Sequence, residues 1–137
     1  MEKPIHKDRR HVLKLGGVML CAFACGKPEA VLPVEDKPFE IMLTEGQATS
    51  LQQIGGFVFV GQFFIMRLSA TDFRVLSRWC THAAGALRFN AGANRLECPV
   101  HGSVFNTEGA VLQGPATMPL KRYRYELRQD RLIIFLD

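Results

Sequence analysis

Two short segments of the chain each carry one cysteine and one histidine. The first holds Cys80 and His82, the second holds Cys98 and His101, and fifteen residues separate His82 from Cys98. Thiolate and imidazole groups are common ligands of zinc and iron, so four of them on two segments indicate a metal site. One interpretation is a tetrahedral zinc ion with two sulfur and two nitrogen ligands.

The distribution of these ligands favours a second interpretation. Zinc fingers usually pair like with like, with two cysteines on one turn and two histidines on a helix. Here each segment supplies one of each, and no helical pattern surrounds them. A mixed pair on each segment suits an asymmetric cluster in which one metal ion takes both thiolates and the other takes both imidazoles.

The elements that must position these segments are predicted to be short strands. Runs rich in β-branched and aromatic residues occupy 39–43, 56–60, 63–68, 73–80, 95–99, 123–128 and 131–137. Gly61-Gln62 and Gln129-Asp130 are typical of hairpin turns between such strands. Beyond residue 30, only 45–54 could hold a short helical turn. The prediction is an all-β fold of small antiparallel sheets, packed as a sandwich or barrel.

The two segments resemble the cluster-binding boxes of Rieske iron–sulfur proteins. The stretches in question are CTHAAG at 80–85 and CPVHGSVF at 98–105. The later stretch GPATMPL at 114–120 is similar to the proline-containing loop that covers the cluster in that family, so Gly114 and Pro115 are expected beside it. The resemblance implies a Rieske-type antiparallel β-sandwich or barrel, with a small cluster-binding subdomain formed by two loops.

The resemblance covers residues 40–137 and implies one [2Fe–2S] cluster per chain. By this resemblance Cys80 and Cys98 bind the inner iron, while His82 and His101 bind the outer, more exposed iron. Neutral imidazoles in place of two thiolates raise the reduction potential to roughly −150 to +300 mV, against about −400 mV for plant-type ferredoxins. The exposed imidazoles are expected to couple electron uptake to protonation.

Two departures from the Rieske proteins of cytochrome bc complexes stand out. Those proteins carry an extra cysteine in each box, joined as a disulfide, whereas this chain has Gly85 and Val100 there. Those proteins also place a serine and a tyrosine hydroxyl near the sulfurs. Ser103 matches the serine, although it could instead only cap its loop, and Phe105 replaces the tyrosine. Both departures weaken the case for quinol oxidation in a bc complex without excluding it.

Residues 1–24 have the layout of an export signal. A basic segment ends at Lys14, an apolar stretch of about ten residues follows, and small residues precede Cys25. The pair Arg9-Arg10 resembles the twin-arginine signal motif, and a general secretory signal is the alternative.

Cys25 is a candidate for lipidation. Together with Ala22, Phe23 and Ala24 it resembles a bacterial lipobox, and cleavage before it would leave an odd cysteine at the new N-terminus. An ordinary cleavage site or an uncleaved anchor are the alternatives. Residues 25–38 contain three prolines and are predicted to form an extended linker, which leaves 39–137 as the Rieske domain.

Composition limits the class of function. The formal charge is +4, and residues 1–24, with five basic and two acidic residues, supply +3 of it. The domain lacks the basic surplus typical of nucleic-acid binding. His6 and His11 lie in the export segment, so a second, mononuclear iron site with two further histidines is not expected. The chain is therefore predicted to be an electron-transfer protein and not an enzyme by itself.

The leading hypothesis is an exported carrier, tethered to the periplasmic or outer face of a bacterial membrane. Its expected partners are redox proteins: a cytochrome, a quinol-oxidising complex or a catalytic oxidoreductase subunit. The alternative is the small Rieske subunit of an exported oxidoreductase complex, similar to arsenite oxidase or cytochrome bc. A structural zinc module is the third hypothesis.

Overall fold

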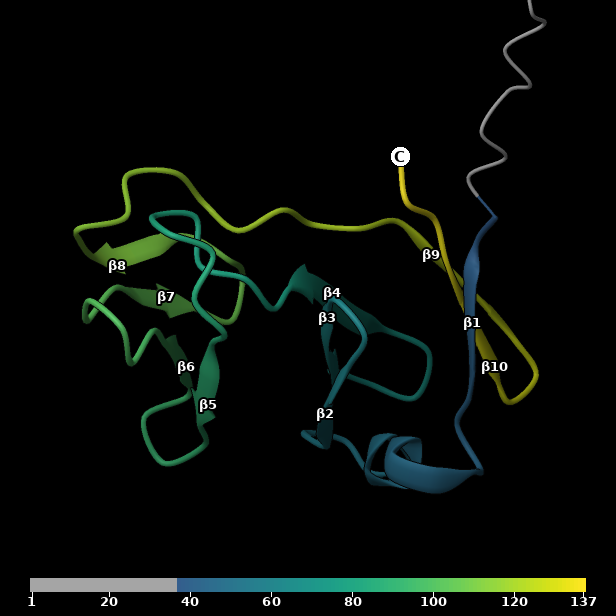
Figure 1. The fold of residues 1–137 in the computed structure, drawn as a ribbon. Helices are drawn as coiled ribbons and strands as arrows, with labels where there is room; N and C mark the ends of the chain where they lie inside the picture. The colour runs from purple at the N-terminus through teal and green to yellow at the C-terminus, as the bar shows by residue number, and fades with distance from the viewer. Residues whose placement is uncertain (1–36) are drawn as a thin grey trace, which may run out of the picture. The chain divides into compact units, whose positions relative to one another are not determined.

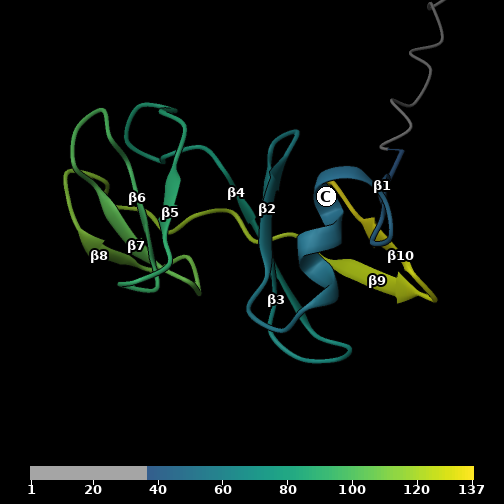
Figure 2. The same ribbon diagram turned by 90° about the horizontal axis from the view of Figure 1, so that it is seen from below.

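The computed structural model describes residues 37–137, which contain ten strands and one 3₁₀ helix. In chain order these are β1 (Phe39–Met42), η1 (Gly46–Gln52), β2 (Phe57–Val60), β3 (Phe63–Arg67), β4 (Phe73–Ser77), β5 (Arg88–Asn90), β6 (Arg95–Glu97), β7 (Val104–Asn106), β8 (Val111–Gln113), β9 (Tyr125–Arg128) and β10 (Arg131–Ile134). They form three antiparallel sheets with the strand orders β1-β10-β9, β2-β3-β4 and β5-β6-β7-β8 (Figures 1 and 2). The all-β prediction is confirmed.

Each predicted run of strand residues contains an observed strand, and every run is longer than its strand. The run at 73–80, for example, ends its strand pairing at Ser77. Three strands of three residues each, β5, β7 and β8, were not expected. Such strands are too short to show an alternating pattern. The possible helical turn at 45–54 is the 3₁₀ helix η1.

Both predicted hairpin turns are present. Val60 lies opposite Phe63, so Gly61-Gln62 is the two-residue turn between β2 and β3. Gln129-Asp130 joins β9 to β10 in the same way. Gly61 and Gln129 have positive φ angles, of 53° and 56°, as tight hairpin turns require.

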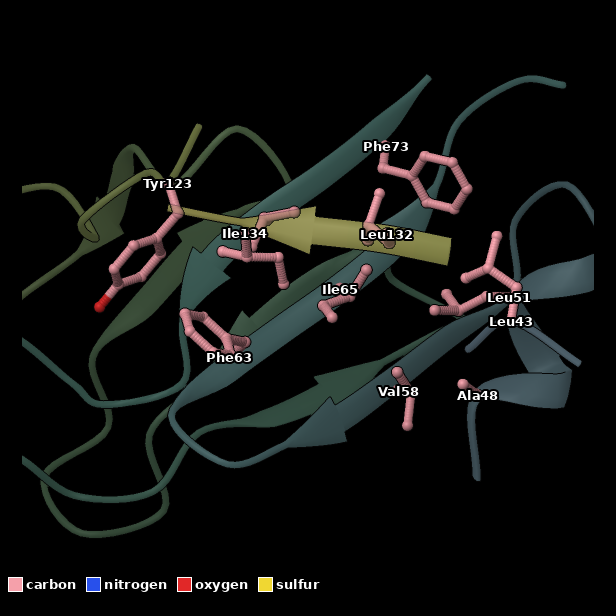
Figure 3. Packing of buried hydrophobic residues seen from close by; sticks show 11 residues of the cluster. Leu43, Ala48, Leu51, Val58, Phe63, Ile65, Phe73, Tyr123, Leu132 and Ile134 are labelled. Atoms are coloured by element: carbon pink, nitrogen blue, oxygen red, sulfur yellow. The ribbon is translucent and has the colours of Figure 1, made fainter. Parts of the chain in front are cut away.

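The sheet β2-β3-β4 contributes to two separate cores, because successive side chains of a strand point to opposite faces. Phe63 and Ile65 of β3 belong to the first, which we call the base core. In this core they are joined by Leu132 and Ile134 of β10 (Figure 3). Phe64, between them in sequence, belongs to the other core.

The second core, which we call the cluster-side core, contains the cysteines of both boxes. Its buried members are Phe64, Leu76, Cys80, Leu87, Leu96, Cys98, Phe105, Ala116 and Leu120. The sheet β2-β3-β4 thus supplies an apolar platform against which both cysteines pack.

An ion pair ties this sheet to the turn between β7 and β8. Arg74 of β4 is only 7% exposed, and its guanidinium donates to the Glu108 carboxylate. The same carboxylate lies 3.7 Å from Arg122. The turn is therefore held to the platform by charge as well as by packing.

The predicted export signal at 1–24, the lipidation candidate Cys25 and most of the linker lie outside the described residues. Within 37–137, no helix combines the length and the apolar character needed to cross a bilayer.

Candidate metal centre

The two boxes fold into loops with the same backbone turn. In the first loop, Cys80–Gly85, the Cys80 N–H donates to the Gly85 carbonyl at 2.8 Å, and the Ala84 N–H donates to the Cys80 carbonyl at 2.9 Å. The cysteine at its start and the glycine at its end are thereby brought together.

The second loop, Cys98–Ser103, repeats both bonds at the same positions. The Cys98 N–H donates to the Ser103 carbonyl at 2.8 Å, and the Gly102 N–H donates to the Cys98 carbonyl at 2.9 Å. The fifth residue has a positive φ in each loop, 52° for Ala84 and 78° for Gly102. Each loop therefore begins with its cysteine, and the histidine is third in the first loop and fourth in the second.

The four predicted ligands lie together as two pairs. Cys80 and Cys98 are buried, with 4% and 2% exposure, and form no disulfide. His82 and His101 are exposed, and their Nδ1 atoms face each other at 3.2 Å. Two nitrogens bound to one tetrahedral zinc ion at about 2.0–2.1 Å would lie about 3.4 Å apart, so this spacing fits a shared metal ion.

The donor set suits a binuclear site. Among residues 37–137, no three His, Cys, Asp or Glu side chains are placed to hold a single metal ion. The thiol pair and the imidazole pair instead offer two ligands each, which is the number that each metal of a His/Cys-ligated [2Fe–2S] cluster requires from the protein. The residues present therefore fit such a cluster.

Hydrogen bonds favour the thiolate form of Cys80. Burial acts to raise the pKa of this thiol, but hydrogen bonds from the backbone N–H of His82 and from the side chains of Cys98 and Ser103 outweigh it. The pKa of Cys80 consequently lies below its ordinary value. The thiolate is the form of cysteine that binds metals.

The sixth residue of each loop lies beside the cysteine of the other loop. A Cβ built on Gly85 would stand 3.1 Å from the Cys98 sulfur and 2.7 Å from Cγ2 of Val100. Ser103, at the matching position of the second loop, is fully buried, and its side chain is one of the groups that lower the pKa of the Cys80 thiol. Gly85, by contrast, leaves room for the Cys98 sulfur and for Val100.

A third loop, Gly114–Leu120, lies between β8 and β9. This loop and Gln113, the last residue of β8, each contact the second loop. The Gln113 side chain donates to the Gly102 carbonyl at 3.1 Å. The Ala116 N–H donates to the Ser103 hydroxyl oxygen at 3.0 Å, within the buried interior. Gly114 and Pro115, which the resemblance predicts to lie beside the cluster, immediately precede Ala116 and are joined by a cis peptide bond.

The third loop also contacts the first. The Thr81 hydroxyl donates to the Met118 carbonyl at 2.7 Å. Phe105 is fully buried and packs in the cluster-side core, which also contains both cysteines. Its ring has no hydroxyl to offer a sulfur, in keeping with the departure noted in the sequence.

Sequence reasoning did not single out Thr81, Gln113 or Ala116. Thr81 and Gln113 carried one usable signal, because they are polar residues next to segments that are otherwise apolar and uncharged. Ala116 carried none, since it acts through its backbone N–H.

Comparisons with known proteins agree with this geometry. A family model of the Rieske [2Fe–2S] domain matches residues 42–124. The chloroplastic cytochrome b6-f complex iron-sulfur subunit of Volvox carteri is 37% identical over 60 residues, which cover 44% of this chain and 29% of that protein. The corresponding subunit of Gloeobacter violaceus is 36% identical over 55 residues, covering 40% of this chain and 30% of that protein. The matched part thus spans under a third of these relatives' own length.

Solved structures show the same fold. The plasma membrane Rieske protein of Synechocystis PCC 6803 aligns with a TM-score of 0.54 at 20% identity, covering 65% of this chain and 94% of that chain. A hyperthermophilic respiratory Complex III contains a chain with a TM-score of 0.53 at 22% identity, covering 80% and 83%. The family model alone matches more than half of the chain. This protein therefore belongs to the Rieske [2Fe–2S] domain family, whose cofactor is a [2Fe–2S] cluster.

Proposed function

We propose that Cys80, His82, Cys98 and His101 hold the [2Fe–2S] cluster of this electron-transfer domain. When bound, the cluster accepts and returns one electron at a time. The observation that carries the proposal is the segregation of the donors: two buried, free thiols, and two exposed imidazoles whose Nδ1 atoms lie 3.2 Å apart. Burial of the two thiols would exclude water from the side of the cluster that they bind. The exposed imidazoles would give a redox partner the shortest path to the cluster.

Loss of the cluster in a ligand variant tests this assignment. Purified full-length protein should contain two irons and two acid-labile sulfides per chain, with the low average g-value of a His-ligated cluster when reduced. Cys98→Ala should remove both iron and sulfide. Cys25→Ala is the matched control, because it deletes a thiol outside the two loops and should keep the full iron content. Stoichiometric zinc without labile sulfide in the natively produced protein would instead support the structural zinc module.

The rim around the imidazoles indicates the kind of partner surface. The three loops, 80–85, 98–103 and 114–120, contain no Asp, Glu, Lys or Arg, in a chain with 22% charged residues. Val100 and Met118 on this rim are 57% and 61% exposed. Charged groups around a binding site attract partners of opposite charge. This rim has none, so it suits a partner surface that is likewise apolar and uncharged.

Salt dependence tests this docking mode. Electron transfer between the protein and solubilised membranes of its source should vary little with ionic strength, since salt screens only charge-based association. Met118→Glu should slow the transfer without altering the reduced spectrum. A rate that falls steeply with added salt in the unmodified protein would overturn the uncharged docking mode.

We also infer that residues 1–24 are an export signal, that 25–38 form an anchor cysteine and linker, and that 39–137 form the Rieske domain. The protein would then work as a tethered carrier at the outer face of a bacterial membrane. Mass spectrometry of the mature N-terminus tests this inference: a lipid-modified Cys25 is expected. Arg9→Lys combined with Arg10→Lys should hold the precursor in the cytoplasm. An unmodified Cys25 or an intact Met1 in membranes would defeat the lipid anchor.

A second candidate is a subunit of an oxidoreductase complex. The observation that favours it is that the similar curated proteins are named as subunits of the cytochrome b6-f complex. Affinity purification from solubilised membranes separates the two candidates. Stoichiometric copurification with a large membrane or catalytic subunit identifies a complex, whereas isolation as a single chain identifies a carrier.

A further inference from the structure

Trp79 is the only tryptophan of the chain, and it stands at the base of the first loop. It directly precedes Cys80 and pairs with Ala86 across the base of that loop in an antiparallel bridge. Its side chain is 43% exposed and belongs to neither the base core nor the cluster-side core. Packing within the domain therefore gives little reason for this large ring, and tryptophan is a residue that protein interfaces favour.

Arg78, the residue before it, has its guanidinium over two aromatic rings. The guanidinium carbon lies 5.2 Å from the centre of the Trp79 ring and 5.4 Å from the centre of the Phe59 ring. Its Nη1 donates to the Gly61 carbonyl at 3.3 Å. Attraction to two ring faces and one hydrogen bond restrict the position of this cation. The guanidinium is thus fixed in place beside the exposed Trp79.

The Arg78 cation has no carboxylate partner within residues 37–137. Six other arginines in the described part of the chain each lie in an ion pair with a carboxylate: Arg74, Arg95, Arg122, Arg124, Arg128 and Arg131. Arg78 is absent from these pairs, and its Nε is buried without a hydrogen-bond partner in the same part of the chain. A guanidinium carries five N–H donors, of which the Gly61 carbonyl accepts one. The Arg78 guanidinium can therefore bind an acceptor from another molecule.

We propose that Arg78 and Trp79 form a docking site for the redox partner, in which a carboxylate of the partner binds the Arg78 guanidinium and an apolar side chain of the partner covers Trp79. This inference rests on the proposed function, because it requires a partner to dock beside the loops that hold the cluster. The planar fork of an arginine suits a carboxylate, which it binds through two parallel hydrogen bonds.

This site is continuous with the uncharged rim, since Trp79 and Ala86 flank the first loop at its base. One ion pair at the edge of the rim orients the partner. It does not create the field of several charges that steers association over a distance and makes it strongly salt-dependent. The site therefore agrees with an electron-transfer rate that varies little with ionic strength.

Loss of the guanidinium tests the proposal. Electron transfer between the purified holoprotein and solubilised membranes of its source is measured at increasing protein concentration. Arg78→Met keeps an apolar stem against Phe59 and removes the cation. We expect the half-saturating concentration to rise about fivefold or more, as for a strong interface residue, with the reduced spectrum unchanged. Trp79→Ala should also raise it, and the two changes together should cost less than their sum, because ring and cation act as one unit.

Arg88→Met is the matched control. Arg88 is an exposed arginine that likewise has no carboxylate partner within 37–137, and its guanidinium lies over no aromatic ring there. Its removal changes the net charge equally and should alter the half-saturating concentration little. Equal effects of Arg88→Met and Arg78→Met would show that charge alone matters and would overturn the site. Arg78→Lys should recover little, because an ammonium lacks the fork. Full recovery by lysine would overturn it as well.

A second measurement does not depend on the variants. In hydroxyl-radical footprinting of the unmodified holoprotein, Trp79 should be oxidised severalfold less when the solubilised membranes are present. Ile54, which is 68% exposed beside η1, should be oxidised equally with and without them. If Arg78→Met loses its cluster, the footprint decides, and an unprotected Trp79 overturns the docking site. An unmodified protein without a reducible cluster would instead defeat the ligand assignment first, and the docking site with it.

Discussion

The two loops that carry the proposed metal ligands share one backbone turn and differ in the residue at its end. Each begins with a buried cysteine whose N–H donates to the carbonyl of the sixth residue, and each has a positive φ at its fifth residue. The sixth residue is Gly85 in the first loop and the buried Ser103 in the second. The shared backbone turn sets the positions of the two cysteines. The sixth residue then differs in role: Gly85 allows close packing, whereas Ser103 offers a hydroxyl for hydrogen bonding.

Removal of the metal should have the largest effect on the two loops. Chelating the iron from the folded protein should leave four ligands without a partner, so both loops should loosen together. We expect the amides of Ala84 and Gly102, which close the two turns, to exchange hydrogen much faster in the metal-free protein. Amides of β3, which lies between two paired strands, should change little. Loosening of only one loop would show that the turns are not equivalent in energy.

A disulfide engineered between the loops should give the next largest effect. A Cβ built on Gly85 lies 3.4 Å from the Cβ of Val100, close to the separation of about 3.5–4.5 Å found in disulfides. Gly85→Cys combined with Val100→Cys should therefore form a bond that closes a segment of about 15 residues. We expect up to about 3 kcal/mol more free energy of unfolding in the oxidised form.

The reduced form of the same double variant is its control, measured by denaturant unfolding. Two free thiols that resist oxidation would show that the loops lie farther apart in solution than the structure places them.

Adding a single methyl group to the first loop should cost less. Gly85→Ala would place its Cβ 2.7 Å from Cγ2 of Val100, and 3.1 Å from the sulfur of Cys98. Overpacking of this kind typically costs about 1–3 kcal/mol of unfolding free energy. Val100→Ala in the same protein should recover much of the loss. Equal stability of Gly85→Ala and the unmodified protein in denaturant titrations would mean that Val100 moves freely.

The smallest expected effects concern the fifth residues. Ala84 holds a left-handed backbone that glycine adopts more readily, so Ala84→Gly should gain up to about 1 kcal/mol of unfolding free energy. Gly102→Ala should lose about 1 kcal/mol for the same reason. Thermal unfolding of the two variants side by side measures both. The same sign of change in both would contradict the equivalence of the two turns.

The sequence predicted the long strands well, and it singled out the four residues that we propose as ligands. The strands β2, β3 and β4 are rich in aromatic and β-branched residues, and such runs are recognisable without knowledge of their neighbours. The four proposed ligands stood out because thiols and imidazoles are few in this chain and occur in two mixed pairs. Types and spacing carried both predictions.

Features that depend on tertiary contacts could not be predicted in this way. The strands β5, β7 and β8 have three residues each, and each ends or begins with a polar residue, so no period is visible. The bond from Ala116 to Ser103 spans thirteen residues and uses a backbone amide, which no residue type announces. Contacts of this kind arise from the path of the third loop.

The double use of β3 protects the fold against a specific error. Phe63 and Phe64 are adjacent in sequence yet belong to different cores. A slip of β3 by one residue against its neighbours would send every side chain to the opposite face and direct Phe63 toward the cysteines. Because β3 pairs with β2 on one edge and β4 on the other, the slip would have to occur twice at once. The register of this five-residue strand therefore favours the correct arrangement of the cluster-side core, even in the protein without iron.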